Sequence, residues 1–371
     1  MSEERSRMSY PSFDEKELRV TEYVEVRGRS VPVFDTPITP RENSILAHMH
    51  KQPCWMLTDM ENRMFCPSII PDQRARGYVA EAEKLSEEDF GGPDMFGVEW
   101  RYIPVAKGSM VVPGNPILRD VNDWREVIRF PDIDSWDWEG SAEKNREYLQ
   151  QSNQCTILGL LNGCWFERLL SFMDFEGAAM ALIDEDQQDA LKELLHETTS
   201  LYMRILDKCV QYYRFDGVCI HDDWGSQMAP FFSEQIARAL FLPEMKRFVS
   251  HAHQLGKFVD LHSCGHVEDR CNIFVEAGFD SWTPMTMNNT AELYRKYGDK
   301  IVIGLAPDTV FDPQTASEEK QRQAARDFVA KYTQAGKLCS LAVNNCPPGL
   351  MTQAFREELY KASRIRYMQE D

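Results

Sequence analysis

The sequence predicts a TIM (β/α)8 barrel, because eight short apolar runs recur along the chain and helical stretches separate most of the later ones. Gly256, Gly278 and Gly336 each stand between a helical stretch and the next apolar run, where glycine commonly ends a helix. The expected strands are 54–58, 96–102, 155–161, 217–221, 257–261, 279–284, 301–305 and 339–344. The expected helices are 166–183, 187–213, 243–255, 267–277, 290–297 and 317–335.

The segments outside this alternation are expected to add to the barrel rather than build it. Residues 1–44 are charged and lack a clear period, so we expect an N-terminal arm or cap there and the barrel domain over 45–371. Residues 66–153 are rich in Gly, Pro and Trp, which predicts an inserted segment before the third strand. An open doubly wound sheet is the alternative. The eight runs, and the lack of a GxGxxG-type loop after the first, count against it.

The composition predicts a globular protein with an acidic surface. Apolar residues make up 43% and charged residues 27%, while the formal net charge of −18 disfavours nucleic acid as a partner. No apolar run has the roughly 18 residues that a membrane helix needs, and residues 1–16 are too polar for a signal peptide, so we expect a cytoplasmic protein. The ten cysteines are spread along the chain. In a cytoplasmic protein this indicates reduced thiols, mostly in the core. A homodimer is left open.

A candidate metal motif follows the fifth apolar run. His262 and Cys264 are two positions apart, so in a strand their side chains point the same way. They can therefore offer an imidazole and a thiolate to one ion, and Gly265 lets the chain turn directly after them. The alternative is a buried histidine beside a core cysteine.

Two further candidate ligands follow other runs. Cys346 comes directly after the eighth run, and since strand ends converge on one rim of a barrel, Cys346 can meet His262 and Cys264. Three such ligands with an open fourth position are typical of catalytic zinc. Glu167, beyond the third run, is a candidate additional ligand. Its alternative role is that of a solvated glutamate in the first turn of a helix.

Candidate catalytic and substrate-binding residues follow the fourth and sixth runs. Asp222 and Asp223 are adjacent, so one carboxylate should point inward and the other away. Either can support the zinc histidine or bind substrate, and helix capping is the alternative. Trp224, Trp282 and Met285 are candidates for the wall of an apolar substrate pocket, although each can instead be a core residue.

Together these motifs resemble the uroporphyrinogen decarboxylase superfamily, in its corrinoid-dependent methyltransferase branch. The similarity covers roughly residues 53–349. The motifs that carry it are His262-x-Cys264-Gly265, Asp222-Asp223-Trp224-Gly225, Gly278-Phe279-Asp280, the Cys346 loop, Asp94-Met95-Phe96-Gly97-Val98-Glu99-Trp100 and Pro113-Gly114-Asn115-Pro116.

The resemblance implies a TIM barrel and a function. Members that decarboxylate porphyrinogens carry an arginine-rich N-terminal motif, which residues 57–63 lack. The zinc-bearing members transfer methyl groups to or from a separate cobalamin protein, and this chain is most similar to the methyltransferase component of anaerobic O-demethylases. The resemblance thus implies zinc on His262 and Cys264, with Cys346 and Glu167 carried over by position alone. It also implies a partner corrinoid protein and a methoxylated aromatic substrate.

In the implied reaction zinc polarises the ether oxygen, the Co(I) corrinoid attacks the methyl carbon, and Asp222 or Asp223 orients a ring hydroxyl. Three alternatives remain. The first is transfer from a methylcorrinoid to a zinc-activated thiol of the coenzyme M type. The second is a metal-stabilised protein that binds small aromatic compounds without turnover, and the third is a metal-free enzyme resembling the decarboxylases.

Overall fold

The structure of the chain is a computed structural model that describes residues 10–26, 29–150, 153–160, 163–307, 311–346 and 349–369. Leu161 of the predicted third strand, and Pro347 and Pro348 of the Cys346 loop, lie outside the described residues. The strands are β1 Val20–Val26, β2 Arg29–Phe34, β3 Leu57–Thr58, β4 Asn62–Phe65, β5 Gly92–Pro93, β6 Glu99–Ile103, β7 Gly108–Val111, β8 Cys155–Leu160, β9 Gly217–His221, β10 Phe258–His262, β11 Ser281–Trp282, β12 Val302–Leu305 and β13 Cys339–Leu341.

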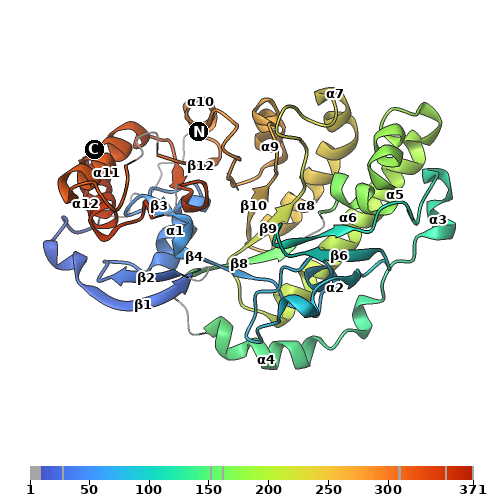
Figure 1. Cartoon of the computed structure of the whole chain (residues 1–371), viewed down its shortest axis with the longest axis horizontal. Helices are drawn as coiled ribbons and strands as arrows, with labels where there is room; N and C mark the ends of the chain where they lie inside the picture. Colours follow the sequence, from blue (N-terminus) through green and yellow to red (C-terminus); the bar gives the residue numbers. More distant parts are fainter. Residues whose placement is uncertain are drawn as a thin grey trace. The chain divides into compact units, whose positions relative to one another are not determined.

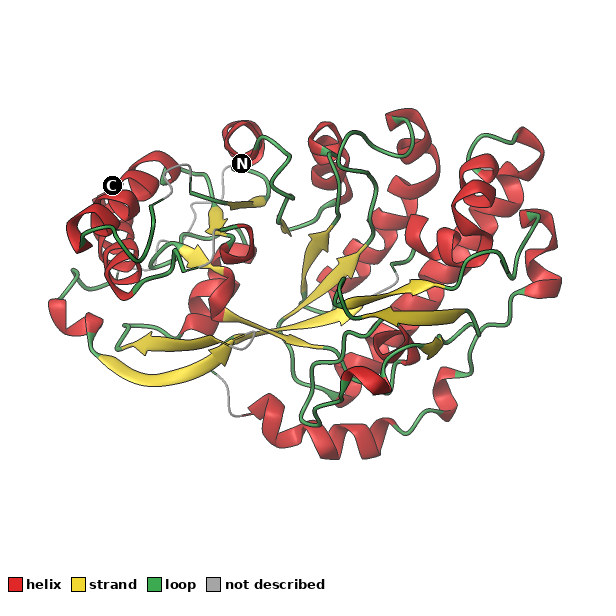
Figure 2. Cartoon of the chain, in the orientation of Figure 1, coloured by secondary structure: helices red, strands yellow, loops and turns green. Residues whose placement is uncertain are grey.

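The helices alternate with the later strands, as predicted (Figures 1 and 2). They are α1 Pro40–His48, α2 Pro71–Ala75, α3 Trp124–Val127, α4 Trp138–Gln150, α5 Phe166–Ala181, α6 Gln188–Tyr212, α7 Glu234–Ile236, α8 Leu242–Gln254, α9 Cys271–Ala277, α10 Thr290–Tyr297, α11 Glu318–Tyr332 and α12 Gln353–Gln369. Gly278 ends α9 with a φ of 94°, a left-handed conformation that glycine adopts without strain.

An eight-stranded sheet has the order β3-β13-β12-β11-β10-β9-β8-β4. Its described pairs from β8 to β10 and from β11 to β3 are parallel, and strands that follow one another from β8 to β13 are neighbours. β3 and β4, the two ends of this order, are separated in the chain only by the short helix Asp59–Glu61. The fold is therefore of the TIM-barrel class, which confirms the predicted fold class.

The predicted second strand is wrong. Residues 96–102 contribute β6, which pairs antiparallel with β5 and β7 in a separate three-stranded sheet, and β4 takes the expected place in the large sheet. In β6 Glu99 and Arg101 are exposed while Trp100 is buried, the alternation of a sheet with one solvated face. β4 is short and begins with Asn62 and Arg63, so no apolar run marks it in the sequence.

One compact unit comprises Met1–Arg63, Asn153–Cys155 and Asp280–Asp371. It contains the β1–β2 hairpin, the strands β3, β11, β12 and β13, and the helices α1 and α10 to α12. Arg364 of α12 is fully buried and forms an ion pair with Glu17 at 3.0 Å, so the N-terminal segment is anchored to the last helix. The predicted domain boundary at Ser44 falls inside α1.

The other compact unit comprises Met64–Ser152 and Thr156–Phe279. It contains β9 and β10, nearly all of β8, and the helices α2 to α9, with α6 packed on α8 and α8 on β10 (Figure 1). The inserted segment before β8 holds α2 to α4 and the three-stranded sheet. Arg168 of α5 is buried and ion-paired with Asp72 and Asp94, which ties α5 to that segment.

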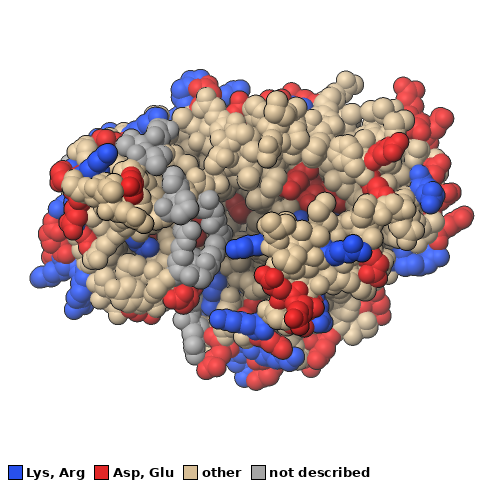
Figure 3. Space-filling view, viewed as in Figure 1, with Lys and Arg blue, Asp and Glu red and all other residues tan. Residues whose placement is uncertain are grey.

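The surface carries both signs of charge. Acidic and basic side chains are interspersed on the face that Figure 3 shows. Among the described residues, no helix is long and apolar enough to cross a membrane.

Candidate metal centre

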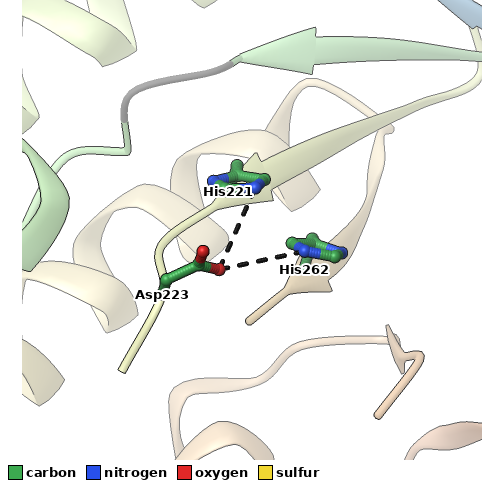
Figure 4. Close-up of side chains that lie close together, drawn as sticks. All are labelled: His221, Asp223 and His262. Carbon is green, nitrogen blue, oxygen red and sulfur yellow. Dashed lines mark ion pairs between the residues drawn. The ribbon is translucent and has the colours of Figure 1, made fainter. Parts of the chain in front are cut away.

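Two histidines end neighbouring parallel strands. The strands β9 and β10 are mostly buried, and their last residues, His221 and His262, are partly exposed. These two are register partners, so their imidazoles stack with ring centroids 4.5 Å apart and planes inclined by 15° (Figure 4). The parallel register of two buried strands thus delivers two nitrogen donors to one place.

Asp223 faces both imidazoles. Its Oδ1 lies 3.9 Å from Nε2 of His221 and 3.8 Å from Nε2 of His262, as the dashed lines in Figure 4 mark. Within the described parts of the chain, these three residues form the group whose ligand atoms all lie within 4.8 Å of one another. Burial and the nearby Glu167 carboxylate raise the pKa of Asp223, against the charge of His221.

Cys264 places a sulfur atom beside His262. Its Sγ lies 3.2 Å from Nε2 of His262, and its backbone N–H donates to Oδ1 of Asp223 at 2.7 Å. In tetrahedral zinc sites a nitrogen and a sulfur donor lie about 3.5 Å apart, since Zn–N is about 2.0 Å and Zn–S about 2.3 Å. The donor set and this spacing therefore fit zinc, which accepts imidazole, thiolate and carboxylate ligands.

Glu167 contacts the centre through His221. Its carboxylate forms an ion pair with Arg76 at 3.0 Å and a short hydrogen bond with Nδ1 of His221. Burial alone would raise the pKa of Glu167, but Arg76 and His221 together hold it well below its usual range. Burial alone would lower the pKa of His221, and Glu167 raises it instead. Glu167 is thus an ionised group that orients the imidazole, and its predicted role as a zinc ligand stays a prediction.

Asp222 is not part of the ligand group and holds the start of α5 instead. It is fully buried, and its carboxylate accepts from the backbone N–H of Glu167 at 2.8 Å and of Phe166 at 3.3 Å. The indole N–H of Trp224 donates to it at 2.6 Å. Burial and the Glu167 charge raise the pKa of Asp222 to about 7, against these hydrogen bonds. The two adjacent carboxylates therefore have different partners: Asp222 binds the start of α5, and Asp223 faces the two imidazoles.

The predicted substrate-binding residues lie at different depths. Trp224 is fully buried and packs edge-on against Phe232, with ring centroids 5.1 Å apart. Trp282 in β11 is fully buried, while Met285 after it is partly exposed. Trp282 and Met285 belong to the compact unit that contains β11, and Trp224 belongs to the unit that contains β9. Substrate contact by these three residues stays a prediction.

Cys346 belongs to the compact unit that contains β13. It follows the short helix Val343–Asn345, and its thiol donates to the carbonyl of Ala342 at 3.3 Å. The side chain is partly exposed, so the sulfur is not a core thiol. Its predicted place beside His262 and Cys264 stays a prediction.

Sequence reasoning missed His221 and Arg76. His221 ends the fourth apolar run as His262 ends the fifth, and that equivalence of position was a usable signal. Arg76 follows α2, far from the other residues in the chain, and reaches Glu167 only through the tertiary fold.

No protein-family model and no curated protein matches the chain. A solved structure described as a methyltransferase from Methanosarcina mazei matches 88% of this chain and 98% of its own, with a TM-score of 0.57 and 14% identity. Xylanase B from Clostridium stercorarium F9 and a xylose isomerase-like TIM barrel protein from Mycobacterium smegmatis reach a TM-score of only 0.33, at 8% and 11% identity. They cover 56% and 64% of this chain and 73% and 82% of their own. The chain is therefore similar in fold to the methyltransferase from Methanosarcina mazei over nearly the whole of that protein.

Proposed function

We propose that this protein is a zinc-dependent methyltransferase that moves a methyl group from a methoxylated aromatic compound to the Co(I) corrinoid of a separate protein. The observation that carries the proposal is the group of His221, Asp223 and His262 at the ends of β9 and β10, with the Cys264 thiol 3.2 Å from the His262 imidazole. Its setting, in a fold similar to that of a methyltransferase, supports the reaction class.

The donor group suits a catalytic ion. Imidazole and thiolate are ligands that zinc prefers, and a protein that supplies three of them leaves a position for substrate. His262 and Cys264 are the central pair, since their donor atoms lie 3.2 Å apart. Cys346 and Glu167 stay proposed as additional ligands. When bound, zinc supplies Lewis acidity at the ether oxygen.

The protein side chains position this chemistry. Glu167 and Arg76 orient His221, and Asp222 holds the first turn of α5, on which Glu167 stands. Asp223 accepts from the N–H of Cys264 and so fixes the loop that carries the thiol. Asp223 is the carboxylate that we propose for orienting a ring hydroxyl of the substrate, because Asp222 is enclosed by its own donors.

The proposed reaction balances as a methyl transfer. The bond between the methyl carbon and the ether oxygen breaks, and its electron pair stays on the phenolate. The corrinoid substrate in its Co(I) state contributes the electron pair of the new bond to carbon. The aromatic compound leaves as a phenol after taking up a proton.

The test is a spectroscopic assay with purified protein, a Co(I) corrinoid protein and a panel of methoxylated aromatic compounds. We expect the Co(I) spectrum to change to that of a methyl-corrinoid only when zinc is present at about one ion per chain. His262→Ala should remove both the zinc and the transfer. His251→Ala removes a histidine of α8 that pairs with Asp207 of α6; it is the matched control and should keep both the zinc and the transfer.

The same preparation separates the alternatives. Methyl transfer from a methyl-corrinoid to a thiol, without the forward reaction, would assign the opposite direction. Zinc binding and aromatic binding without any methyl-corrinoid would indicate a binding protein. A chain that binds no zinc, or a His262→Ala variant that keeps the transfer, would overturn the proposal.

A further inference from the structure

A cavity lies within the compact unit that contains β1, β2 and α12. It shares no residue with the histidine centre. Its volume is about 70 Å³. At about 10–15 Å³ for each water-sized position, it holds roughly five to seven non-hydrogen atoms. Its walls are mostly apolar, and they include Val24, Val31, Val33, Trp55, Met60 and Leu359.

One side chain in this cavity is an acid in an apolar setting. Glu61 accepts the indole N–H of Trp55 through Oε1 at 2.8 Å, while its Oε2 is buried without a hydrogen-bond partner. Burial raises the pKa of Glu61 to about 8, against the hydrogen bonds with Trp55 and Asn43 and the charge of Arg356. At neutral pH the carboxyl is therefore mostly protonated, and its O–H can donate to a ligand.

The lining also contains the guanidinium of Arg356, which forms no ion pair within the described residues and whose titratable neighbour is the mostly protonated Glu61. The guanidinium of Arg356 lies 3.7 Å from the Met60 sulfur and 3.3 Å from the carbonyl oxygen of Pro32. Neither of these groups is charged, and no carboxylate of the described chain lies within ion-pair distance of Arg356. Burial lowers the pKa of Arg356 to about 10, which still leaves it cationic at neutral pH. A cation in such surroundings is costly unless an anion joins it.

We propose that this cavity binds a small apolar monocarboxylate, whose carboxylate pairs with Arg356 and accepts a hydrogen bond from Glu61. The apolar body of the ligand fills the space between the β1–β2 hairpin and α12. A four-carbon acid such as butyrate has six non-hydrogen atoms, which matches the capacity of the cavity. A bound acid of this kind would tie the N-terminal hairpin to the last helix.

The test is isothermal titration of the full chain with butyrate, 1-butanol and butylamine, which share an alkyl chain and differ in charge. We expect saturable binding of butyrate, with the alcohol and the amine each at least about tenfold weaker, as the loss of a charge-assisted hydrogen bond predicts. No saturable binding of butyrate, or equal binding of the three compounds, would overturn the proposal and leave a space that holds only water.

Matched variants locate the binding. Arg356→Met should weaken butyrate binding about tenfold or more, while Arg356→Lys keeps the charge and should retain part of it. Glu61→Gln keeps a neutral donor and should retain binding. Should Arg356→Met fail to fold, Val33→Phe fills the cavity and should abolish binding. His262→Ala should leave butyrate binding unchanged. A failure of the methyl-transfer proposal can therefore be told apart from a failure of the butyrate site. Butyrate binding that survives both Arg356→Met and Val33→Phe would contradict the site.

Discussion

The imidazoles of His221 and His262 stack 4.5 Å apart because the two residues are register partners at the ends of neighbouring parallel strands. Two imidazolium cations this close repel one another, whereas two neutral imidazoles can both donate a nitrogen lone pair to one metal cation.

Glu167→Gln should weaken zinc binding about 10- to 100-fold, the usual cost of losing a partner that orients a metal-ligating histidine. The amide keeps the shape of the side chain but loses the charge that pairs with Arg76 and His221. Competition with a chromogenic zinc chelator measures the change. Glu176→Gln, at an exposed position on the same helix, should bind zinc like the unaltered protein. Equal zinc affinity in both variants would show that Glu167 does not support zinc binding.

Gly265→Ala should disrupt the loop that carries Cys264. A β-carbon at this position would lie 2.2 Å from the backbone oxygen of Gly225, and the φ of +100° is already unfavourable for alanine. Gly256→Ala is the control, because its φ is +71° but no atom lies within 4 Å of the added carbon. We expect the control to lose about 1 kcal/mol from strain alone.

Gly265→Ala should lose more of the free energy of unfolding than its control and should also bind zinc more weakly. Urea denaturation and zinc titration of both variants check this pair. Equal losses in the two variants would show that the approach of Gly225 does not constrain the loop.

Arg168→Met should destabilise the protein by about 3–5 kcal/mol, because it leaves the buried carboxylates of Asp72 and Asp94 without their cation. Arg125→Met removes an exposed ion pair with Glu193 and should cost about 1 kcal/mol or less. Chemical denaturation of both variants gives the difference in unfolding free energy. A small loss for Arg168→Met would mean that the two carboxylates are protonated or solvated.

Glu61 should make the stability of the protein depend on pH. Burial raises its pKa from 4.5 to about 8 in the folded chain. Between these two values the folded state therefore binds more protons than the unfolded state. Its contribution to stability is therefore complete below pH 4.5 and is lost as the pH rises through 8.

Urea midpoints measured from pH 5 to pH 8.5 check this dependence. Glu61→Gln should flatten it, because the amide does not titrate. Glu22→Gln, at an exposed position on β1, should leave the dependence as it is. A Glu61→Gln profile parallel to that of the unaltered protein would contradict the raised pKa.

Local patterns in the sequence were sufficient for much of the fold. Buried parallel strands are continuous apolar runs, so β8, β9, β10 and β12 could be predicted closely, and the helices between them show the usual period and glycine ends. β4 was missed because it is short and begins with polar residues, and β6 was misplaced because a strand of a small antiparallel sheet also contains apolar residues.

At the site, too, local sequence patterns predicted some residues and missed others. The two-residue spacing of His262 and Cys264 places both side chains on one side of a strand end, and that is a local property. The meeting of His221 with His262 depends on the register between two strands, and the link from Arg76 through Glu167 joins residues 91 positions apart. The sequence by itself thus determined the strand, the thiol and one imidazole. Only the tertiary structure decided which charges surround them, because the packing of distant segments sets burial and ion pairing.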